Sequence, residues 1–486
     1  MIKRTFVIIL LLISSVNFFA QNETDALRYS YLTHGGTSRY VGMSGAFSAL
    51  GADFSVLSTN PAGIGMFKKS RFVFSPGVIS TNSTTNYLNE NTSDELISAN
   101  INSLGLILNI KSYEEDETGW RTVAFGVGYN HLKNFSDDIT IEGVNNNSSL
   151  LDLFMLNSDG YHPEDLGDIE WMAFDTYATD TLENSDYTYI NPLFLENYGE
   201  HQKKVIKTKG GIGEWVFSLG GNYQNIIQIG ATFGIQNIRF SSVTEHTETT
   251  ESSDFENFKY IENLETQGTG YNFKFGMIYR PVNFLRVALA FHTPTFYTLS
   301  DVYSYSMQTN WRSADVDGNT QYNATAGEYD YYYEFYSPHR TVAGIALILS
   351  RIAIISADYE YLNYGKARFR ADDYEFEDEN NRISEAFNDG HNFRVGTEIR
   401  LAPIYLRGGV SYYSSATSAT YDANGSVKAY SLGIGLKTMN TYIDFAFNHS
   451  FTNQDYLMYE YDPGMYESAK LNLVEDLISI TFGYKF

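Results

Sequence analysis

The last ten residues, Leu477-Ile-Ser-Ile-Thr-Phe-Gly-Tyr-Lys-Phe486, decide the fold class. Successive side chains of a β-strand point to opposite faces. One face here is apolar and carries Ile478, Ile480, Phe482, Tyr484 and Phe486. The other face is small or charged and carries Ser479, Thr481, Gly483 and Lys485. Such a strand, ending in an aromatic residue, is typical of a wall between lipid and a wet lumen, so it predicts an outer-membrane β-barrel.

Alternating segments recur along the whole chain, and there are about fourteen of them. They lie near 70–80, 101–111, 120–132, 213–223, 226–241, 269–280, 284–299, 340–349, 352–361, 391–401, 404–415, 428–437, 441–450 and 476–486. Short connections such as Gln224-Asn225 and Ala402-Pro403 alternate with long ones. The long connections lie near 81–100, 133–212, 242–268, 300–339, 362–390, 416–427 and 451–475. This sorting of loop lengths is typical of a bacterial outer-membrane barrel with periplasmic turns and external loops, and not of a soluble sandwich.

The two ends of the chain and its composition agree with export to the outer membrane. Residues 1–20 predict a signal peptide, with Lys3 and Arg4 before an apolar run and Ala20 before the cleavage point. Its removal changes the formal net charge from −25 to −27, which argues against a nucleic-acid partner. The chain has no cysteine, so disulfides, thiolate metal sites and a lipoprotein anchor are excluded.

Charged side chains occupy the strand faces opposite the apolar ones. Charge facing lipid is costly, so these residues are expected to line the lumen. The set comprises Lys274, Arg280, Arg286, His292, Asp358, Glu360, Arg394, Glu398, Arg400, Arg407, Lys437 and Asp444. We interpret most of them as a salt-bridged ladder that stiffens the barrel, and ligand contact is the alternative.

Residues 21–68 do not alternate and precede the barrel, which we place at 69–486. The stretch 39–53 is rich in Gly, Ala and Ser, and Thr59-Asn-Pro-Ala-Gly-Ile-Gly65 predicts a rigid turn before the first strand. Small residues allow close backbone packing, so this segment is expected to sit in the barrel mouth as a plug.

At these residues the chain resembles the FadL-type outer-membrane transport proteins, including the branch found in Bacteroidetes-like bacteria. The resemblance rests on the stretches 45–53, 58–65, 290–297, 355–361 and 406–412, in this order. It implies a fourteen-stranded barrel, which agrees with the independent count, and an N-terminal hatch in the lumen. It also implies a hydrophobic ligand path from the outer loops to the hatch.

The resemblance further implies a kinked third strand, with a side opening in the wall beside the hatch turn. Carried over, the hatch motif comprises Asn60, Pro61, Ala62 and Gly63. The third strand is Trp120–Leu132, where Gly126 or Gly128 is the kink candidate. The alternative is that both glycines only relieve crowding in a tilted strand.

The largest expected external loop, 133–212, contains apolar residues at helical spacing. The resemblance implies that such residues form a hydrophobic surface groove that captures ligand. The candidates are Leu151, Phe154, Trp171 and Phe174. The alternative, which we favour, is that the loop packs a small core of its own over the barrel.

The leading functional hypothesis is passive uptake of hydrophobic small molecules, fatty-acid-like or aromatic, with outer-membrane lipid and lipopolysaccharide as the surroundings. The family also has members that act as docking or shuttle subunits in type 9 secretion, so a scaffold role with a protein partner is the second hypothesis. A barrel-embedded hydrolase is the third and weakest. The sequence shows no motif for a cofactor, a metal or energy coupling, so we expect no enzyme and no cofactor.

Overall fold

A computed structural model describes residues 22–33, 35–111, 119–183, 185, 187–195, 198–251, 254–350, 352–417, 425–462 and 465–486. The signal peptide predicted over residues 1–20 lies outside these ranges.

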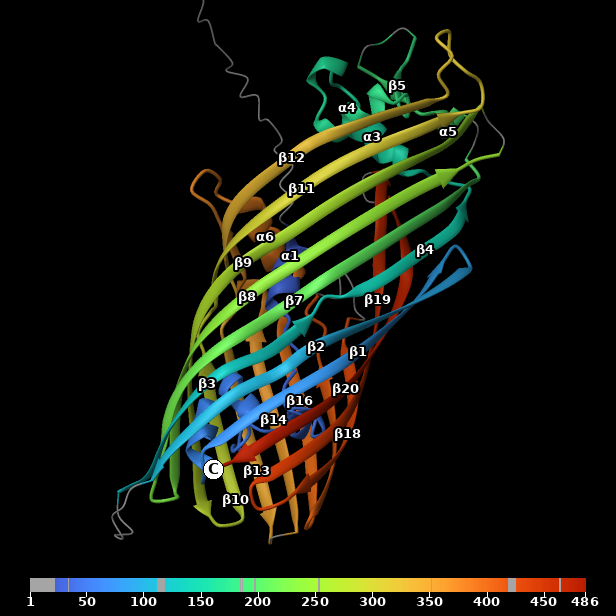
Figure 1. The fold of residues 1–486 in the computed structure, drawn as a ribbon. Coiled ribbons are helices and arrows are strands. Elements are labelled where there is room, and N and C mark those ends of the chain that lie inside the picture. Colours follow the sequence, from blue (N-terminus) through green and yellow to red (C-terminus); the bar gives the residue numbers. More distant parts are fainter. Residues whose placement is uncertain are drawn as a thin grey trace, which may run out of the picture.

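The described chain forms a closed antiparallel β-barrel (Figure 1). Eighteen strands make the sheet. In four places two consecutive strands follow one another along the same line of the wall and count as one wall strand. The wall therefore has fourteen wall strands, the number expected from the sequence. Ten wall strands are uninterrupted: β1 (Arg71–Tyr87), β2 (Glu90–Lys111), β7 (Glu200–Tyr223), β8 (Ile227–Thr249), β9 (Phe255–Val282), β16 (Asp389–Leu401), β17 (Ile404–Tyr413), β18 (Val427–Lys437), β19 (Thr441–Asp462) and β20 (Met465–Lys485). The four interrupted wall strands are β3 (Trp120–Asn134) with β4 (Asp137–Asn145), β10 (Leu285–His292) with β11 (Phe296–Trp311), β12 (Gln321–Tyr336) with β13 (Arg340–Leu349), and β14 (Ala353–Asn363) with β15 (Arg368–Arg370).

The C-terminal strand closes the barrel. In β20, Phe482 pairs with Phe74 of β1 on one side and with Ile443 of β19 on the other. Closure leaves no open sheet edge along this strand, which lipid requires because it cannot hydrogen-bond to a free backbone.

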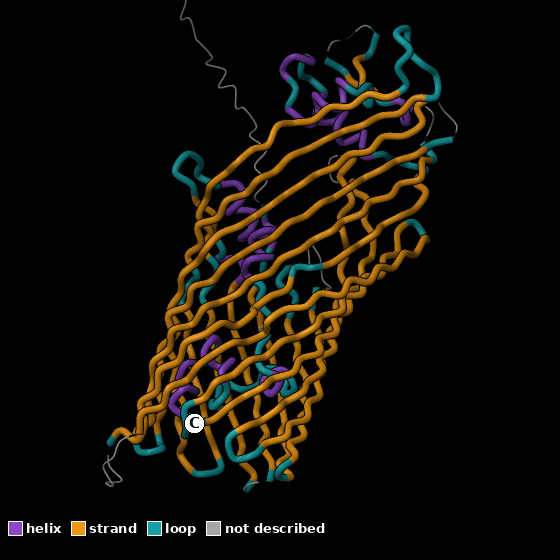
Figure 2. Tube along the Cα trace, in the orientation of Figure 1, coloured by secondary structure: helices purple, strands orange, loops and turns teal. Residues whose placement is uncertain are grey.

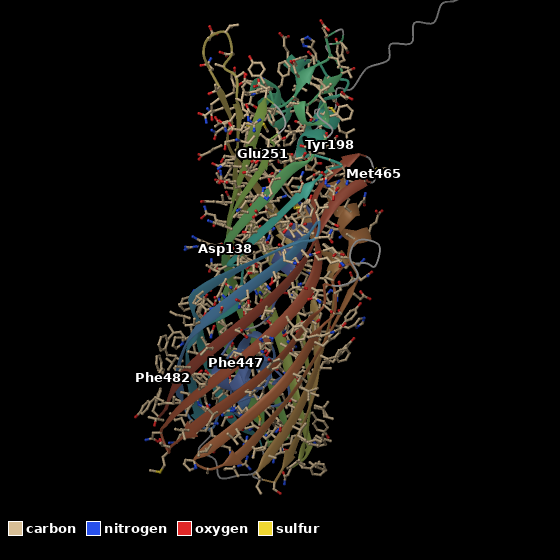
Figure 3. All side chains as sticks on the ribbon, turned by 90° about the vertical axis from the view of Figure 1, so that its right-hand side faces the viewer. Asp138, Tyr198, Glu251, Phe447, Met465 and Phe482 are labelled. Atoms are coloured by element: carbon tan, nitrogen blue, oxygen red, sulfur yellow. The ribbon has the colours of Figure 1, made fainter. Side chains whose placement is uncertain are left out.

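An apolar band surrounds the lower part of the barrel. Its side chains point outward from every second position of the strands and are exposed, as for Phe72, Phe275, Val395, Leu432 and Phe482. Figure 3 shows Phe447 and Phe482 at this level, whereas Tyr198, Glu251 and Met465 lie near the opposite end. A closed barrel with such a band is the architecture of bacterial outer-membrane proteins, so the chain is an outer-membrane barrel.

Short helices lie inside the barrel and over its wide end (Figure 2). The N-terminal ones are α1 (Glu23–Ser30), α2 (Ser38–Val41), η1 (Phe54–Ser58) and η2 (Pro61–Met66). Those after β4 are α3 (Leu150–Ser158), η3 (Pro163–Asp165), α4 (Asp168–Asp175) and α5 (Pro192–Leu195), with the small hairpin β5 (Asp180–Thr181) and β6 (Tyr189–Ile190). Between β14 and β16 lie η4 (Tyr364–Lys366) and α6 (Glu377–Ala386). None of the described helices has the length and apolar character needed to cross a membrane.

Four of the long connections expected from the sequence are mainly strand. The ranges 81–100, 242–268, 300–339 and 451–475 are largely continuations of β1 and β2, β8 and β9, β11 and β12, and β19 and β20. These strands run far beyond the apolar band, as the long green and yellow ribbons of Figure 1 show. Beyond the lipid the outward face no longer has to be apolar, so the alternation that identifies a strand is weakened there, although inward residues such as Phe258 and Met307 are buried.

A charge placed on the lipid face should destabilise the barrel in a depth-dependent way. Ile480 points outward in the middle of the band on β20, whereas Asn472 is exposed on the same strand above it. We expect Ile480→Arg to lower the free energy of unfolding by about 2–4 kcal/mol, and Asn472→Arg by about 0–1 kcal/mol. Denaturant titration in phospholipid vesicles measures both values, and equal losses would contradict this placement of the band.

Candidate functional site: the N-terminal segment and the wall beside it

Asp358 of β14 binds the N-terminal segment to the inner wall. Its carboxylate accepts hydrogen bonds from the backbone N–H groups of Phe47 (2.9 Å) and Ser48 (2.8 Å) and from the Ser48 hydroxyl (2.6 Å). The Asp358 side chain is buried. Hydrogen bonds to a charged acceptor are the stronger ones, so this residue is a principal anchor of the segment.

Glu398 of β16 forms a second anchor. Its carboxylate lies 2.9 Å from Nε of Arg39, which belongs to the N-terminal segment. The same carboxylate lies 2.8 Å from Nε of both Arg407 and Arg400, and Arg407 continues to Asp444 at 2.7 Å. The Arg400 side chain remains 31% exposed, while Glu398 and Arg407 are fully buried. Removing one member of such a buried network leaves another charge uncompensated.

Glu360 organises a third group of charges near α1. Its carboxylate lies 2.9 Å from Arg394 and 3.2 Å from Arg340. Arg340 also donates to the backbone oxygen of Ser30 at the end of α1. The inward-facing charges therefore connect neighbouring strands of the wall to one another and connect the wall to the N-terminal segment.

The motif Asn60, Pro61, Ala62 and Gly63 lies fully inside the barrel. The Asn60 side chain accepts from the Ala62 N–H (3.1 Å) and donates to the Ser48 oxygen (2.7 Å), while Pro61 opens η2. A Cβ at Gly63 would overlap Val56. The turn is thus built for close packing, and η2 contacts β7, β8 and β9.

The wall separates between β2 and β3. Their ladder runs from Lys111↔Thr122 to Ser103↔Asn130 and ends there, although β2 continues to Glu90. Beyond this point β4 follows β7 and crosses the inner face of the β1–β2 hairpin. It is held there by side chains instead of a backbone ladder, because hydroxyls of β1 donate to carbonyls of 136–140. These bonds are Thr81 to Ser136 (3.3 Å), Ser83 to Asp138 (2.6 Å) and Thr85 to Thr140 (2.7 Å).

Both kink candidates lie just below this separation and contact the N-terminal segment. Gly128 has φ +157°, and a Cβ there would overlap the Leu104 oxygen, its partner Gly105 and the Phe54 ring. A Cβ at Gly126 would approach Leu57 and Ile64. The Gly105–Gly128 pair makes room for Phe54, and neither Gly105 nor Phe54 was among the residues proposed from the sequence. The pairing of Gly105 with Gly128 is the only signal that could have indicated these residues. That pairing cannot be found without knowing the register of β2 against β3.

Unpaired polar atoms gather at the separation. Within the described part of the chain, both amide atoms of Asn100, Nδ2 of Asn102 and Nε2 of His131 are buried without a hydrogen-bond partner. Leaving a buried polar atom unpaired costs about 1–3 kcal/mol. These three residues lie on either side of the point where the β2–β3 ladder ends.

Two hollows meet at His131. The first is an interior cavity of about 80 Å³ between the N-terminal segment and the wall, lined among others by Tyr40, Val41, Asn102, His131, Lys133 and Leu477. The second is an outer-wall groove of about 620 Å³ lined among others by Tyr129, His131, Gly211, Gly213, Asn237 and Arg239. His131 lines both hollows, with its backbone oxygen towards Gly35 of the N-terminal segment and its ring towards Gly211 of the groove.

The four capture candidates do not share one surface. Leu151 and Phe154 are buried in a core that α3 and α4 form with the upper strands, whereas Trp171 is 43% exposed and Phe174 is half-buried. Asp152 caps α3 by accepting from the Ser149 N–H, and burial raises the pKa of its carboxyl. Leu151 and Phe154 pack inward because an apolar helix face does so wherever a wall is available, and a capture role for the four residues stays a prediction.

Loss of the Asp358 anchor should loosen the N-terminal segment without opening the wall. We expect Asp358→Asn to raise amide hydrogen exchange of residues 42–66 by about tenfold or more, since a charged acceptor of this kind contributes about 1.5–3 kcal/mol. Asp389→Asn is the matched control, because Asp389 is exposed and accepts only from the Tyr361 hydroxyl among described residues. Exchange measured by mass spectrometry in bicelles checks this, and equal effects of the two variants would contradict it.

Comparison with known proteins shows the fold. No family model matches the sequence, and no curated protein matches it. Among solved structures, a Pseudomonas aeruginosa FadL homologue superposes with a TM-score of 0.56 at 10% identity, over 94% of this chain and 100% of the other. A deletion mutant of the TodX monoaromatic hydrocarbon channel gives 0.53 at 12% identity, over 93% and 99%. The Pseudomonas putida toluene transporter TodX gives 0.51 at 12% identity, over 93% and 99%. The chain therefore has the fold of the FadL-type barrels.

Proposed function

We propose that this protein is a passive channel through which hydrophobic small molecules cross the outer membrane. The observation that carries the proposal is the wall separation between β2 and β3, beside which the interior cavity lies between the N-terminal segment and the wall. Residues 21–68 serve as the hatch, with Asn60, Pro61, Ala62 and Gly63 as its turn. The solved neighbours whose names specify hydrocarbon channels support the same class of ligand.

We further propose that ligand leaves sideways through the wall. Ile97 and Ile101 are exposed on β2 above the last β2–β3 pair, so lipid reaches the level of the separation. An apolar molecule released there enters the acyl chains directly and avoids water, which is favourable in proportion to its apolar area. Gly128 is our candidate for the residue that lets β3 leave β2, and Gly126 for close packing against the hatch.

The described conformation is closed. Its interior cavity of about 80 Å³ is smaller than the roughly 150 Å³ that an apolar cavity needs to hold benzene. Passage of an aromatic ring or an acyl chain therefore requires a movement of the hatch or of β4. The side-chain bonds between β4 and the β1–β2 hairpin are fewer than a full ladder would supply, so this part of the wall is the one that opens most easily.

The middle of the lumen is suited to aromatic or acyl ligands. A buried cluster of aromatic side chains packs α1 of the hatch against the wall there and includes Tyr29, Tyr297, Tyr333, Phe335 and Phe369. Aromatic walls bind both ring-shaped and chain-shaped apolar molecules, so we include both classes in the proposal. Trp171 and Phe174 remain candidates for the first contact on the external helices.

A bulky group on residue 131 should block transport. The chain has no cysteine, so His131→Cys carries a single thiol that a bulky maleimide can modify. We expect uptake of toluene and of oleate to fall at least tenfold after modification, because the group fills both hollows. Uptake is measured with radiolabelled ligand in cells that carry the barrel, before and after modification of the same protein.

Tyr412→Cys provides the control for this experiment. Tyr412 is exposed on β17, away from the separation, so modification of this variant should leave uptake unchanged. Mass spectrometry confirms that the thiols of both variants have reacted. Undiminished uptake through the fully modified His131→Cys barrel would rule out the sideways route.

A scaffold role is the second candidate, and one surface favours it. The external helices and their connections expose many large apolar side chains, namely Leu156, Tyr161, Trp171, Tyr177, Leu182, Tyr187, Phe194 and Leu195. Exposed apolar patches of this kind mark sites of protein or ligand contact. We keep a docking role for secreted or outer-membrane proteins, as in type 9 secretion, as the alternative.

Native mass spectrometry of protein extracted gently from its own membrane separates the two functions. For the channel we expect a single barrel carrying a fatty-acyl or aromatic adduct. A stoichiometric complex with another protein and no small-molecule adduct would reject the channel and favour the scaffold.

A further inference from the structure

The outer-wall groove beside His131 has a floor without side chains. Gly211 and Gly213 of β7 face outward between β3 on one side and β8 on the other. The groove is bounded by Tyr129 and His131 on β3 and by Asn237 and Arg239 on β8. A second hollow of about 240 Å³ continues it upward and is lined by Lys209, Arg239 and Glu265, among others.

Strand register places this groove at the external edge of the apolar band. One row across the wall is Tyr129, Trp215, Ile235 and Tyr271, and it is aromatic or aliphatic. The next row is His131, Gly213, Asn237 and Thr269, and the row above it contains Gly211, Arg239 and Gln267. All three neighbouring strands β7, β8 and β9 change from apolar to polar at the same level. The short turns lie at the other end of the barrel, so this level faces the outer leaflet (Figure 1).

Two cations stand at the upper rim of the groove. Lys209 and Arg239 are both exposed, and within the described residues neither makes an ion pair. Glu265 is the carboxylate that shares the rim, so the local charge is positive in a chain whose formal net charge is −25. The Nε2 atom of His131, buried and unpaired, lies at the side of the same groove.

We propose that this groove binds the phosphorylated headgroup of an outer-leaflet lipid. Lys209 and Arg239 contact the phosphate, since guanidinium and ammonium groups are the usual partners of phosphate oxygens. The glycine floor accommodates the sugar or glycerol portion, and Asn237 and Thr269 offer it hydrogen bonds. The acyl chains follow the row of Trp215 and Tyr271 into the band, where aromatic side chains belong at a membrane interface. The proposal does not depend on transport, because it concerns only the outer face of the wall.

The test measures retention of lipid A by the full-length barrel in detergent, using native mass spectrometry. The probes are bisphosphorylated lipid A, its monophosphorylated form and inorganic phosphate. Each basic residue near a membrane surface contributes about fivefold to the affinity for an acidic lipid. We therefore expect Arg239→Gln and Lys209→Gln each to weaken lipid A binding about fivefold, and the double variant about 30-fold.

Lys259→Gln is the matched control. Lys259 is an exposed cation on β9, paired with Glu245 at 2.9 Å and outside the groove, so its loss should change binding less than twofold. A second variant, Asn237→Trp, fills the groove without changing the charge and should also weaken binding. Heat-dependent migration in gels confirms that each barrel is folded.

Three results would overturn the proposal. The first is a double variant that retains lipid A as well as the unmodified protein. The second is a control variant that loses as much as the double variant. The third is inorganic phosphate bound as tightly as lipid A, which would assign the rim to a free anion instead of a lipid.

Discussion

Lipid offers no hydrogen bonds to a protein backbone, and this constraint governs the whole structure. Almost the entire described wall meets it through continuous ladders, including the closing pair of β20 with β1. One exception lies between β2 and β3 beyond Ser103↔Asn130, where side-chain hydrogen bonds replace the ladder. The ladders between β12 and β15 and between β18 and β19 also end before their strands do, so the separation between β2 and β3 is distinguished by its place beside the interior cavity and the N-terminal segment.

The same constraint explains why the lumen is ionic. Outward positions must be apolar, so charges on the wall can only point inward, where burial is costly unless each charge is paired. Asp358 and Glu398 bind the N-terminal segment directly, and Glu360 pairs with Arg340, which donates to Ser30 of that segment. The N-terminal segment is therefore part of the charge balance of the wall. Its removal as a whole would leave buried charges unpaired, so local movement costs less than expulsion.

How much of this was predictable from the sequence depends on the medium around each residue. Strands 352–361 and 391–401 were predictable because lipid on one face and polar groups on the other impose alternation. The strand extensions beyond the band were not, since their outward faces meet water and their buried residues, such as Phe258 and Met307, pack against helices distant in the sequence. Partners such as Arg39 and Glu398 are 359 positions apart and meet only through barrel closure, which no local pattern encodes. The inward packing of Leu151 and Phe154 depends likewise on the wall that surrounds them.

The position of His131 joins these observations into one argument. Three media meet there: the lumen, the acyl chains of the bilayer and the polar edge of the outer leaflet. On the proposed sideways route, an apolar molecule at this residue would have the open edge of β2 on one side and the groove with Arg239 on the other. The groove lies over β7, β8 and β9, on the far side of β3 from the separation, so a lipid held there would border this part of the wall without covering the edge of β2.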